Sequence, residues 1–199
     1  REIAGLAILV GVTIVAFLVT RSVAANNDDL RRRQAAMWFE TAQEALQSGS
    51  LEPAVVTLRR AVSRDPENKE YRLALARALA ESRLDDEAKR VLFILREAEP
   101  EEPETNLQFA RIEARGSDAD ASRRYYESAL AGLWQPERAG ERRAVRLELI
   151  DFLLARGERD RALSELLVLD ANLPADTAAQ VQVGRLFLSA DDPRQALNR

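Results

Sequence analysis

A spacing of 34 residues is the feature that most limits what this chain can fold into. Pro66 and Pro100 stand 34 residues apart (100 − 66 = 34), and each closes an acidic stretch, Arg64-Asp65-Pro66 and Ala98-Glu99-Pro100. A fixed period of this length is typical of arrays in which one supersecondary unit recurs. Because each unit buries its apolar face only against its neighbours, the period predicts stacked units.

The positions that precede these prolines form a stripe. In four places a small residue is followed by residues four and seven positions later. These sets are Ala54, Leu58, Ala61; Ala88, Leu92, Leu95; Ser122, Tyr126, Ala129; and Ala162, Leu166, Leu169. Such residues share one face of a helix. Ala, Leu, Arg and Glu are abundant, and these residues favour helix.

A second regularity pairs the helices. Twelve residues before each small residue stands another, usually small: Ala42 and Ala54, Ala76 and Ala88, Ala110 and Ser122, Ile150 and Ala162, Gly184 and Ala196. Turn residues lie between them: Gly49-Ser50, Asp85-Asp86, Gly116-Ser117, Gly157-Glu158 and Asp191-Asp192. Small side chains facing each other let two antiparallel helices approach closely. The sequence therefore predicts helix hairpins.

With this pattern the chain resembles a tetratricopeptide repeat protein. The first unit carries the family pattern most fully, from Trp38-Phe39-Glu40-Thr41-Ala42 through Ala54, Leu58 and Ala61 to Pro66. The resemblance covers residues 35–199 and implies an all-α fold, an α-solenoid of TPR-like helix hairpins. We expect units at about 35–68, 69–102, 103–142 and 143–176, with a partial unit at 177–199.

Two features depart from the family pattern. Ile150 occupies a position that is normally small. Six residues are inserted between the third and fourth units, since 40 residues separate Ala110 from Ile150 (150 − 110 = 40) where 34 are expected. The insertion includes Gly132-Leu133-Trp134-Gln135-Pro136.

The N-terminal segment predicts a membrane anchor. Residues 3–20 carry no charge and would span about 27 Å as a helix, close to the ~30 Å hydrocarbon core. We expect a transmembrane helix over residues 1–21, in contact with the lipid bilayer through residues 3–20, and a linker or helix extension over 22–34. A cleaved signal peptide, with Ser22-Val23-Ala24 as its cleavage site, is the alternative, but the apolar run exceeds the usual 7–15 residues.

Orientation and context follow from the flanking charges. Arg21 and Arg31–Arg33 favour a cytoplasmic array by the positive-inside rule. Lys69 and Lys89 are the only lysines, and the preference for Arg indicates a GC-rich bacterial genome. With one apolar stretch, we expect a single-pass protein of the bacterial inner membrane. The chain starts without Met and ends within a helical pattern, so we expect it to be a piece of a longer protein.

Small residues within the apolar stretch suggest a partner in the membrane. Ala4, Ala7 and Gly11 share a face, and small residues at this spacing let two membrane helices pack closely. The general abundance of Ala and Gly in membrane helices is the stronger explanation of these positions.

The composition disfavours chemistry. The chain has no His, which is the commonest general base and metal ligand, and no Cys to form a disulfide or a thiolate metal site. It also has no glycine-rich phosphate loop. A net charge of −4 argues against a nucleic-acid surface. We expect no catalytic site, metal or cofactor, so the chain is predicted not to be an enzyme, and its partners to be other proteins.

The resemblance implies a concave groove lined by the first helix of each unit, where the family holds a peptide or partner helix. The aligned apolar positions are Phe39, Leu73, Leu107, Leu147 and Val181; four residues further along are Gln43, Arg77, Arg111, Asp151 and Arg185. Arg77 and Arg111 beside an apolar strip would suit an extended segment with acidic side chains. Alternatively, the apolar set packs between neighbouring first helices, and the arginines pair with Glu70, Glu104 or Glu113.

Two further interpretations concern the insertion and the function. Trp134 either contacts a partner or caps the end of the third unit's second helix. We expect a structural, accessory subunit that holds together a larger bacterial membrane complex, for example a respiratory, photosynthetic or envelope complex. The alternative is an adaptor that recruits an exchanging soluble client through its groove.

Overall fold

A computed structural model describes residues 2–173, 177–192 and 195 of the chain. The side chains of residues 2–10, 12, 16, 23–25, 177 and 178 lie outside this description. Every regular element in the described ranges is helical, which confirms the predicted all-α fold. The helices are α1 (Glu2–Gln47), α2 (Leu51–Arg64), α3 (Lys69–Glu81), α4 (Asp85–Ala98), α5 (Pro103–Arg115), α6 (Ala119–Ala131), the 3₁₀ helix η1 (Pro136–Arg138), α7 (Ala139–Ala155), α8 (Arg159–Ala171) and α9 (Thr177–Ser189).

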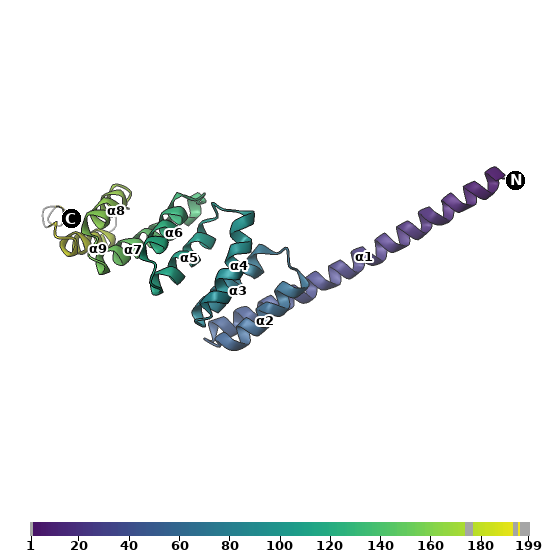
Figure 1. The fold of residues 1–199 in the computed structure, drawn as a ribbon, viewed down its shortest axis with the longest axis horizontal. Helices are drawn as coiled ribbons and strands as arrows, with labels where there is room; N and C mark the ends of the chain where they lie inside the picture. The colour runs from purple at the N-terminus through teal and green to yellow at the C-terminus, as the bar shows by residue number, and fades with distance from the viewer. Residues whose placement is uncertain (1, 174–176, 193–194, 196–199) are drawn as a thin grey trace. The chain divides into compact units, whose positions relative to one another are not determined.

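The chain forms two compact units, Arg1–Val91 and Leu92–Arg199. In unit 1, α2 folds back along the end of α1, and α3 packs against α2 (Figure 1). The core of this unit includes Ala35, Ala61 and Tyr71, with Trp38 and Phe39 packed against them. Helix α1 is continuous from residue 2, so residues 22–34 are part of the same helix that begins the first hairpin.

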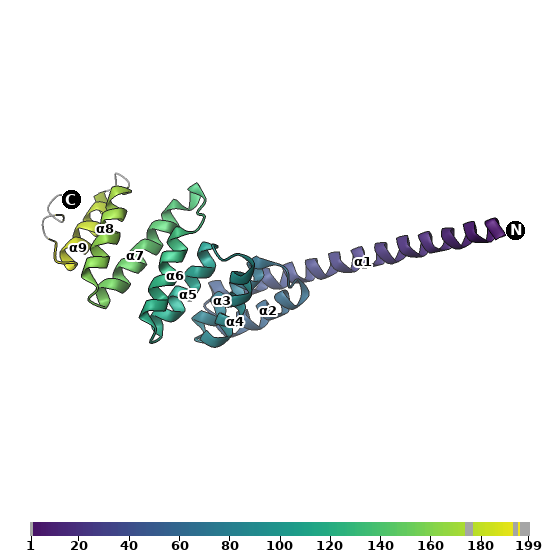
Figure 2. The ribbon, with the colours of Figure 1, turned by 45° about the horizontal axis from the view of Figure 1, so that its top comes forward.

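Unit 2 contains two complete hairpins followed by a single helix. Helices α5 and α6 form the first hairpin and α7 and α8 the second, with α6 against α7 and α8 against α9 (Figure 2). Its apolar side chains gather in two clusters. One is centred on Tyr126, Leu149 and Leu153, and the other on Ile150 and Phe187.

The residues that the sequence pairs across the hairpins are buried. All described members of the five pairs are buried: Ala42, Ala54, Ala76, Ala88, Ala110, Ser122, Ile150, Ala162 and Gly184. Ala196 lies outside the described residues. The Ser122 hydroxyl donates a 2.9 Å hydrogen bond to the Ala110 carbonyl, which confirms that this pair meets face to face. The bond also satisfies a polar group at a fully buried position.

Four described turns, which follow α1, α3, α7 and α9, share one backbone conformation, whereas Gly116 in the α5–α6 turn has a φ angle of −88°. Gly49, Arg83, Gly157 and Asp191 have positive φ angles of 74°, 61°, 74° and 70°. These positions recur with the repeat (83 − 49 = 34; 191 − 157 = 34). In each of these four turns two amides bond back to helix carbonyls, as Gly49 N–H does to Leu46 and Ser50 N–H to Ala45, closing the last turn of the helix.

The prediction that Asp85-Asp86 form the turn of the second hairpin is wrong. The turn lies at Ser82–Leu84, and both aspartates belong to the first turn of α4. Carboxylates are favourable there because the N-terminus of a helix carries partial positive charge. Asp is common in both settings, so residue type alone does not separate them.

The six-residue insertion extends the connection between α6 and α7. It contains η1, and α7 begins at Ala139, four residues before the expected start of the fourth unit at 143 (143 − 139 = 4). Ile150 is accommodated because it points into the second apolar cluster, with Leu166 of α8 and Phe187 of α9.

The predicted transmembrane helix lies mostly outside the described side chains. Across the residues that the structure describes, no helix offers an apolar stretch of the length that a bilayer crossing needs. More than half of residues 3–20, including Ala4 and Ala7, have side chains outside the description. Gly11 is exposed, with open space where a Cβ would stand.

The close approach of α1 and α2 gives a stability test. We expect Ala54→Leu to lower the free energy of unfolding by about 1–3 kcal/mol, because Ala54 is fully buried against α1 and a larger side chain overpacks the contact. Val56→Leu on the same helix is the control, since Val56 is exposed and the change should stay within about 0.5 kcal/mol. Thermal unfolding followed by circular dichroism measures both, and equal effects would contradict the role of the pair.

Candidate functional site

A hollow in unit 1 brings together four of the residues that the sequence places in the groove. It has a volume of about 440 Å³ and is lined by residues of α1 and α3: Phe39, Gln43, Leu46, Gln47, Glu70, Leu73, Ala74, Arg77, Ala78 and Glu81. The four predicted members are Phe39, Gln43, Leu73 and Arg77. They meet here because they occupy matching positions on the first helices of two successive hairpins.

The lining divides into an apolar floor and a polar rim. Phe39 and Leu73 are half-buried, whereas Gln43 and Arg77 are exposed. Phe39 is held from below by Tyr71, whose ring centroid lies 4.6 Å away. A partner segment could bury apolar side chains on this floor and form hydrogen bonds with the rim amides and the guanidinium.

Capping fixes the start of α3, and with it the position of Tyr71. The Asn68 side chain accepts a 3.1 Å hydrogen bond from the Tyr71 amide, so the helix begins at Lys69. Asn is among the preferred residues at this position because its carbonyl satisfies an amide that has no partner within the helix. Tyr71 therefore lies in the first turn, under Phe39.

Arg111, the second predicted guanidinium, is engaged within unit 2. Its Nε and Nη2 atoms donate to both carboxylate oxygens of Glu148 on α7, at 2.9 and 2.5 Å. Hydrogen bonding to Glu148 raises the pKa of Arg111. This partner differs from Glu70, Glu104 and Glu113, which the sequence alternative named. An acidic segment would have to displace Glu148 to bind Arg111.

The Arg111–Glu148 pair also affects Tyr126, which lies in the apolar cluster of α5, α6 and α7. Burial, together with the adjacent Glu148 carboxylate, raises the pKa of Tyr126 to about 12. Both effects disfavour the phenolate because it would be desolvated beside a like charge.

The remaining predicted groove positions differ in their surroundings. Leu107 is buried in the core of unit 2, and Leu147 is half-buried against the cluster around Ile150. Val181, Asp151 and Arg185 are exposed. The packing of Leu107 and Leu147 matches the sequence alternative in which the apolar set stabilises neighbouring helices.

Trp134 lies at the end of α6, packed against the core of unit 2. Its indole Nε1 donates a 2.8 Å hydrogen bond to the Ala129 carbonyl, and the guanidinium of Arg138 lies 5.2 Å from the ring centroid. This is the capping arrangement that the sequence analysis weighed against a partner contact. The neighbouring Leu133, which sequence reasoning passed over, is 83% exposed. The available signal was an apolar side chain, Leu133, in the inserted segment next to a tryptophan that caps a helix.

The buried tyrosine predicts an alkaline transition. In the wild type we expect one of the three tyrosines to ionise near pH 12, and the substitution Tyr126→Phe to remove that step. Because the folded-state pKa exceeds the unfolded value of about 10, the stabilisation is complete below pH 10 and is lost as the pH rises through 12. Tyrosinate absorbance measures the titration. A wild-type chain whose tyrosines all ionise near pH 10 would contradict the assignment.

Comparison with known proteins agrees with this geometry. Residues 45–107 match the tetratricopeptide repeat family. No curated protein matches the chain significantly. Among solved structures, the MamA protein is 14% identical with a TM-score of 0.61, covering 83% of this chain and 87% of that one.

Two further solved structures have a similar fold. PilW, a widely conserved type IV pilus biogenesis factor, is 18% identical with a TM-score of 0.62, covering 81% of this chain and 72% of its own. The pilF protein of Pseudomonas aeruginosa is 17% identical with a TM-score of 0.62, covering 84% and 74%. The tetratricopeptide match thus covers residues 45–107, and the solved structures share the helical fold of the chain.

Proposed function

We propose that this chain is a non-catalytic, membrane-anchored scaffold that holds together a larger bacterial membrane complex through the groove between α1 and α3. The observation that carries the proposal is the hollow of unit 1, where apolar side chains lie beneath a rim of amides and charges. Such a surface suits a peptide or helix that presents apolar side chains at regular intervals. PilW is described as a pilus biogenesis factor, so an envelope-building assembly is one complex to test.

The second candidate function is an adaptor that recruits a soluble client. The exposed, polar rim of Gln43 and Arg77 favours it, because non-obligate interfaces are as polar as the rest of a protein surface. The two functions differ in the lifetime of the complex with the partner: a scaffold keeps its partner, whereas an adaptor exchanges it.

The groove gives a binding test. We expect Leu73→Asp to release the partners that co-purify with the full chain after gentle detergent extraction, because a carboxylate on the apolar floor is desolvated on binding. Val56→Asp, at an exposed position of α2 outside the hollow, is the control and should retain them. Quantitative mass spectrometry compares the two, with circular dichroism to verify folding. Equal recovery from both variants would refute the groove as the binding site.

The same preparation separates the two functions. Extracts of isotope-labelled and unlabelled cells are mixed before purification. A partner that stays in its original isotopic form supports the scaffold, and a partner that mixes between the two supports the adaptor.

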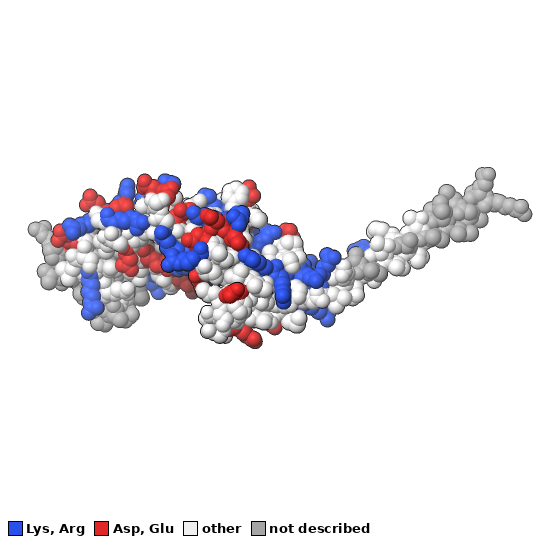
Figure 3. Space-filling view, turned by 60° about the horizontal axis from the view of Figure 1, so that its bottom comes forward, with Lys and Arg blue, Asp and Glu red and all other residues white. Residues whose placement is uncertain are grey.

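Two features of α1 support the proposed membrane anchor: the uncharged residues 3–20 and the basic residues that follow them. Ile14, Val15, Phe17, Leu18 and Val19 are exposed along α1, and so are Arg21 and Arg31–Arg33. Figure 3 shows basic side chains on α1 next to the uncharged part of the helix. A lipid environment would cover the apolar side chains, and the arginines suit the interface.

Membrane attachment is tested by one charge in the apolar stretch. Val15→Arg should shift the full chain from the membrane to the aqueous fraction, since an arginine near the middle of a spanning helix costs about 2.5–3.5 kcal/mol. Leu30→Arg is the matched control on the exposed continuation of α1 and should leave attachment unchanged. Flotation of cell membranes on a density gradient provides the measurement. If the Val15 variant floats with the wild type, the anchor lies elsewhere.

A further inference from the structure

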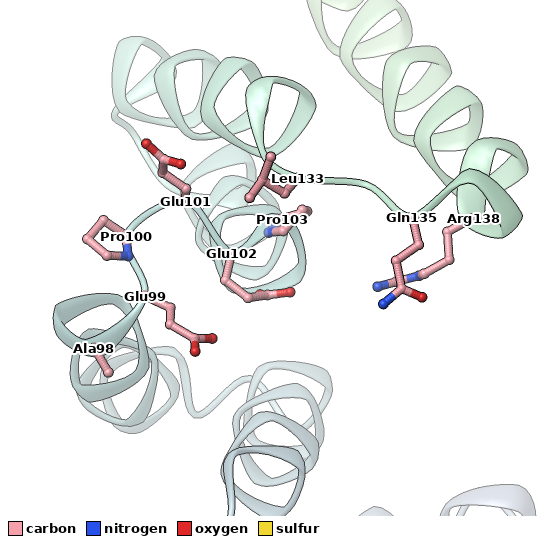
Figure 4. Close-up of a pocket in the computed structure, with 9 residues that line it drawn as sticks. All are labelled: Ala98, Glu99, Pro100, Glu101, Glu102, Pro103, Leu133, Gln135 and Arg138. Carbon is pink, nitrogen blue, oxygen red and sulfur yellow. The ribbon is translucent and has the colours of Figure 1, made fainter.

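A second hollow lies in unit 2, at the connection between hairpins. It has a volume of about 610 Å³ and lies between the α4–α5 turn and the segment that joins α6 to α7. Its lining is Ala98, Glu99, Pro100, Glu101, Glu102, Pro103, Leu133, Gln135 and Arg138. Figure 4 shows the carboxylates of Glu99 and Glu102 pointing into the space that faces Gln135 and Arg138. None of these residues belongs to the predicted groove.

One wall of this hollow is the insertion itself. The connection from α2 to α3 needs four residues, 65–68, and so does that from α4 to α5, 99–102, whereas the α6–α7 connection spans residues 132–138. The longer connection is therefore not required for stacking hairpins. It carries Leu133, whose side chain is 83% exposed while the adjacent Trp134 packs inward. Leu133 is the most exposed of the large apolar side chains that the structure describes, and it stands at the edge of this hollow.

The walls are fixed in place. The buried Asn106 side chain donates to the Pro100 and Glu102 carbonyls at 2.8 and 3.0 Å, which holds the α4–α5 turn. Gly132 touches the same turn, because a Cβ on it would lie 2.4 Å from the Glu101 carbonyl oxygen. A preorganised site loses little conformational entropy when a ligand binds.

The electrostatic character of the hollow is acidic. Three glutamates, Glu99, Glu101 and Glu102, line it, against the single guanidinium of Arg138. The Glu102 carboxylate also caps α5 by accepting a 2.5 Å hydrogen bond from the Thr105 amide, and the Glu101 side chain points away from Gln135 and Arg138 (Figure 4). Arg138 is itself neutralised, since it pairs with Glu141 at 2.6 Å and approaches Glu104 at 3.6 Å. Charge complementarity therefore favours a basic partner and disfavours an acidic one.

We propose that this hollow docks a partner protein segment in which an apolar side chain stands next to lysine or arginine. The apolar residue packs against Leu133 and the prolines of the turn, and its basic neighbour pairs with the glutamates. This site is separate from the unit 1 groove, so the chain has two docking surfaces of different chemistry.

The test uses the full chain in detergent and a phage-displayed library of random short peptides. Phage are selected on the wild type and counter-selected on the double variant Leu133→Ser, Glu99→Lys. We expect the enriched peptides to share an apolar residue beside Lys or Arg. Fluorescence anisotropy of a synthesised peptide should show each single variant weakening binding at least about tenfold, and affinity falling as salt rises.

Controls separate this site from its alternatives. Leu167→Ser, at an exposed leucine of α8, should bind the peptide like the wild type, and circular dichroism verifies that all variants fold. Failure to enrich any peptide, enriched peptides without basic residues, or binding insensitive to Leu133 would overturn the proposal. Loss of binding in Leu73→Asp would assign the peptide to the unit 1 groove. The proposed scaffold function does not depend on any of these results.

Discussion

The close contact between the two helices of each hairpin is the constraint on which the rest of the structure depends. A side chain no larger than alanine at Ala42 and Ala54 lets α1 and α2 approach until their flanking residues interdigitate. Serine serves equally at position 122, because its hydroxyl has a carbonyl acceptor on the facing helix. Within unit 2, the following helix then packs against each hairpin, α7 against α6 and α9 against α8.

The sequence predicts the fold because this constraint repeats. The twelve residues between partners are a short-range relation, and the period of 34 then places successive hairpins on either side of the six-residue insertion. The turns are less predictable. Gly49 and Gly157 signal a left-handed residue, whereas Arg83 adopts the same conformation without a sequence signal. The reading of Asp85-Asp86 as a turn failed because the hydrogen bonds of the turn, not its composition, decide where α4 begins.

The candidate sites likewise include residues that the repeat predicts and contacts that it does not. Phe39, Gln43, Leu73 and Arg77 meet in one hollow because helical phase alone aligns them. The partner of Arg111 could not be predicted, since Glu148 comes from a helix that follows the insertion, 37 residues later (148 − 111 = 37). Trp134, not its neighbour Leu133, is the candidate loop contact that the sequence analysis names. A tryptophan tends to bury its ring and satisfy its N–H locally, as Trp134 does with the Ala129 carbonyl.

The unbroken course of α1 has a mechanical consequence. One helix of 46 residues, about 69 Å long, includes both the uncharged stretch and the first helix of the array, with no intervening loop to absorb rotation. Adding a single residue between positions 22 and 34 would advance the first hairpin by about 1.5 Å and turn it by about 100° around the axis. The helix thus acts as a torsionally stiff shaft, in which the number of residues sets the direction that the unit 1 groove faces.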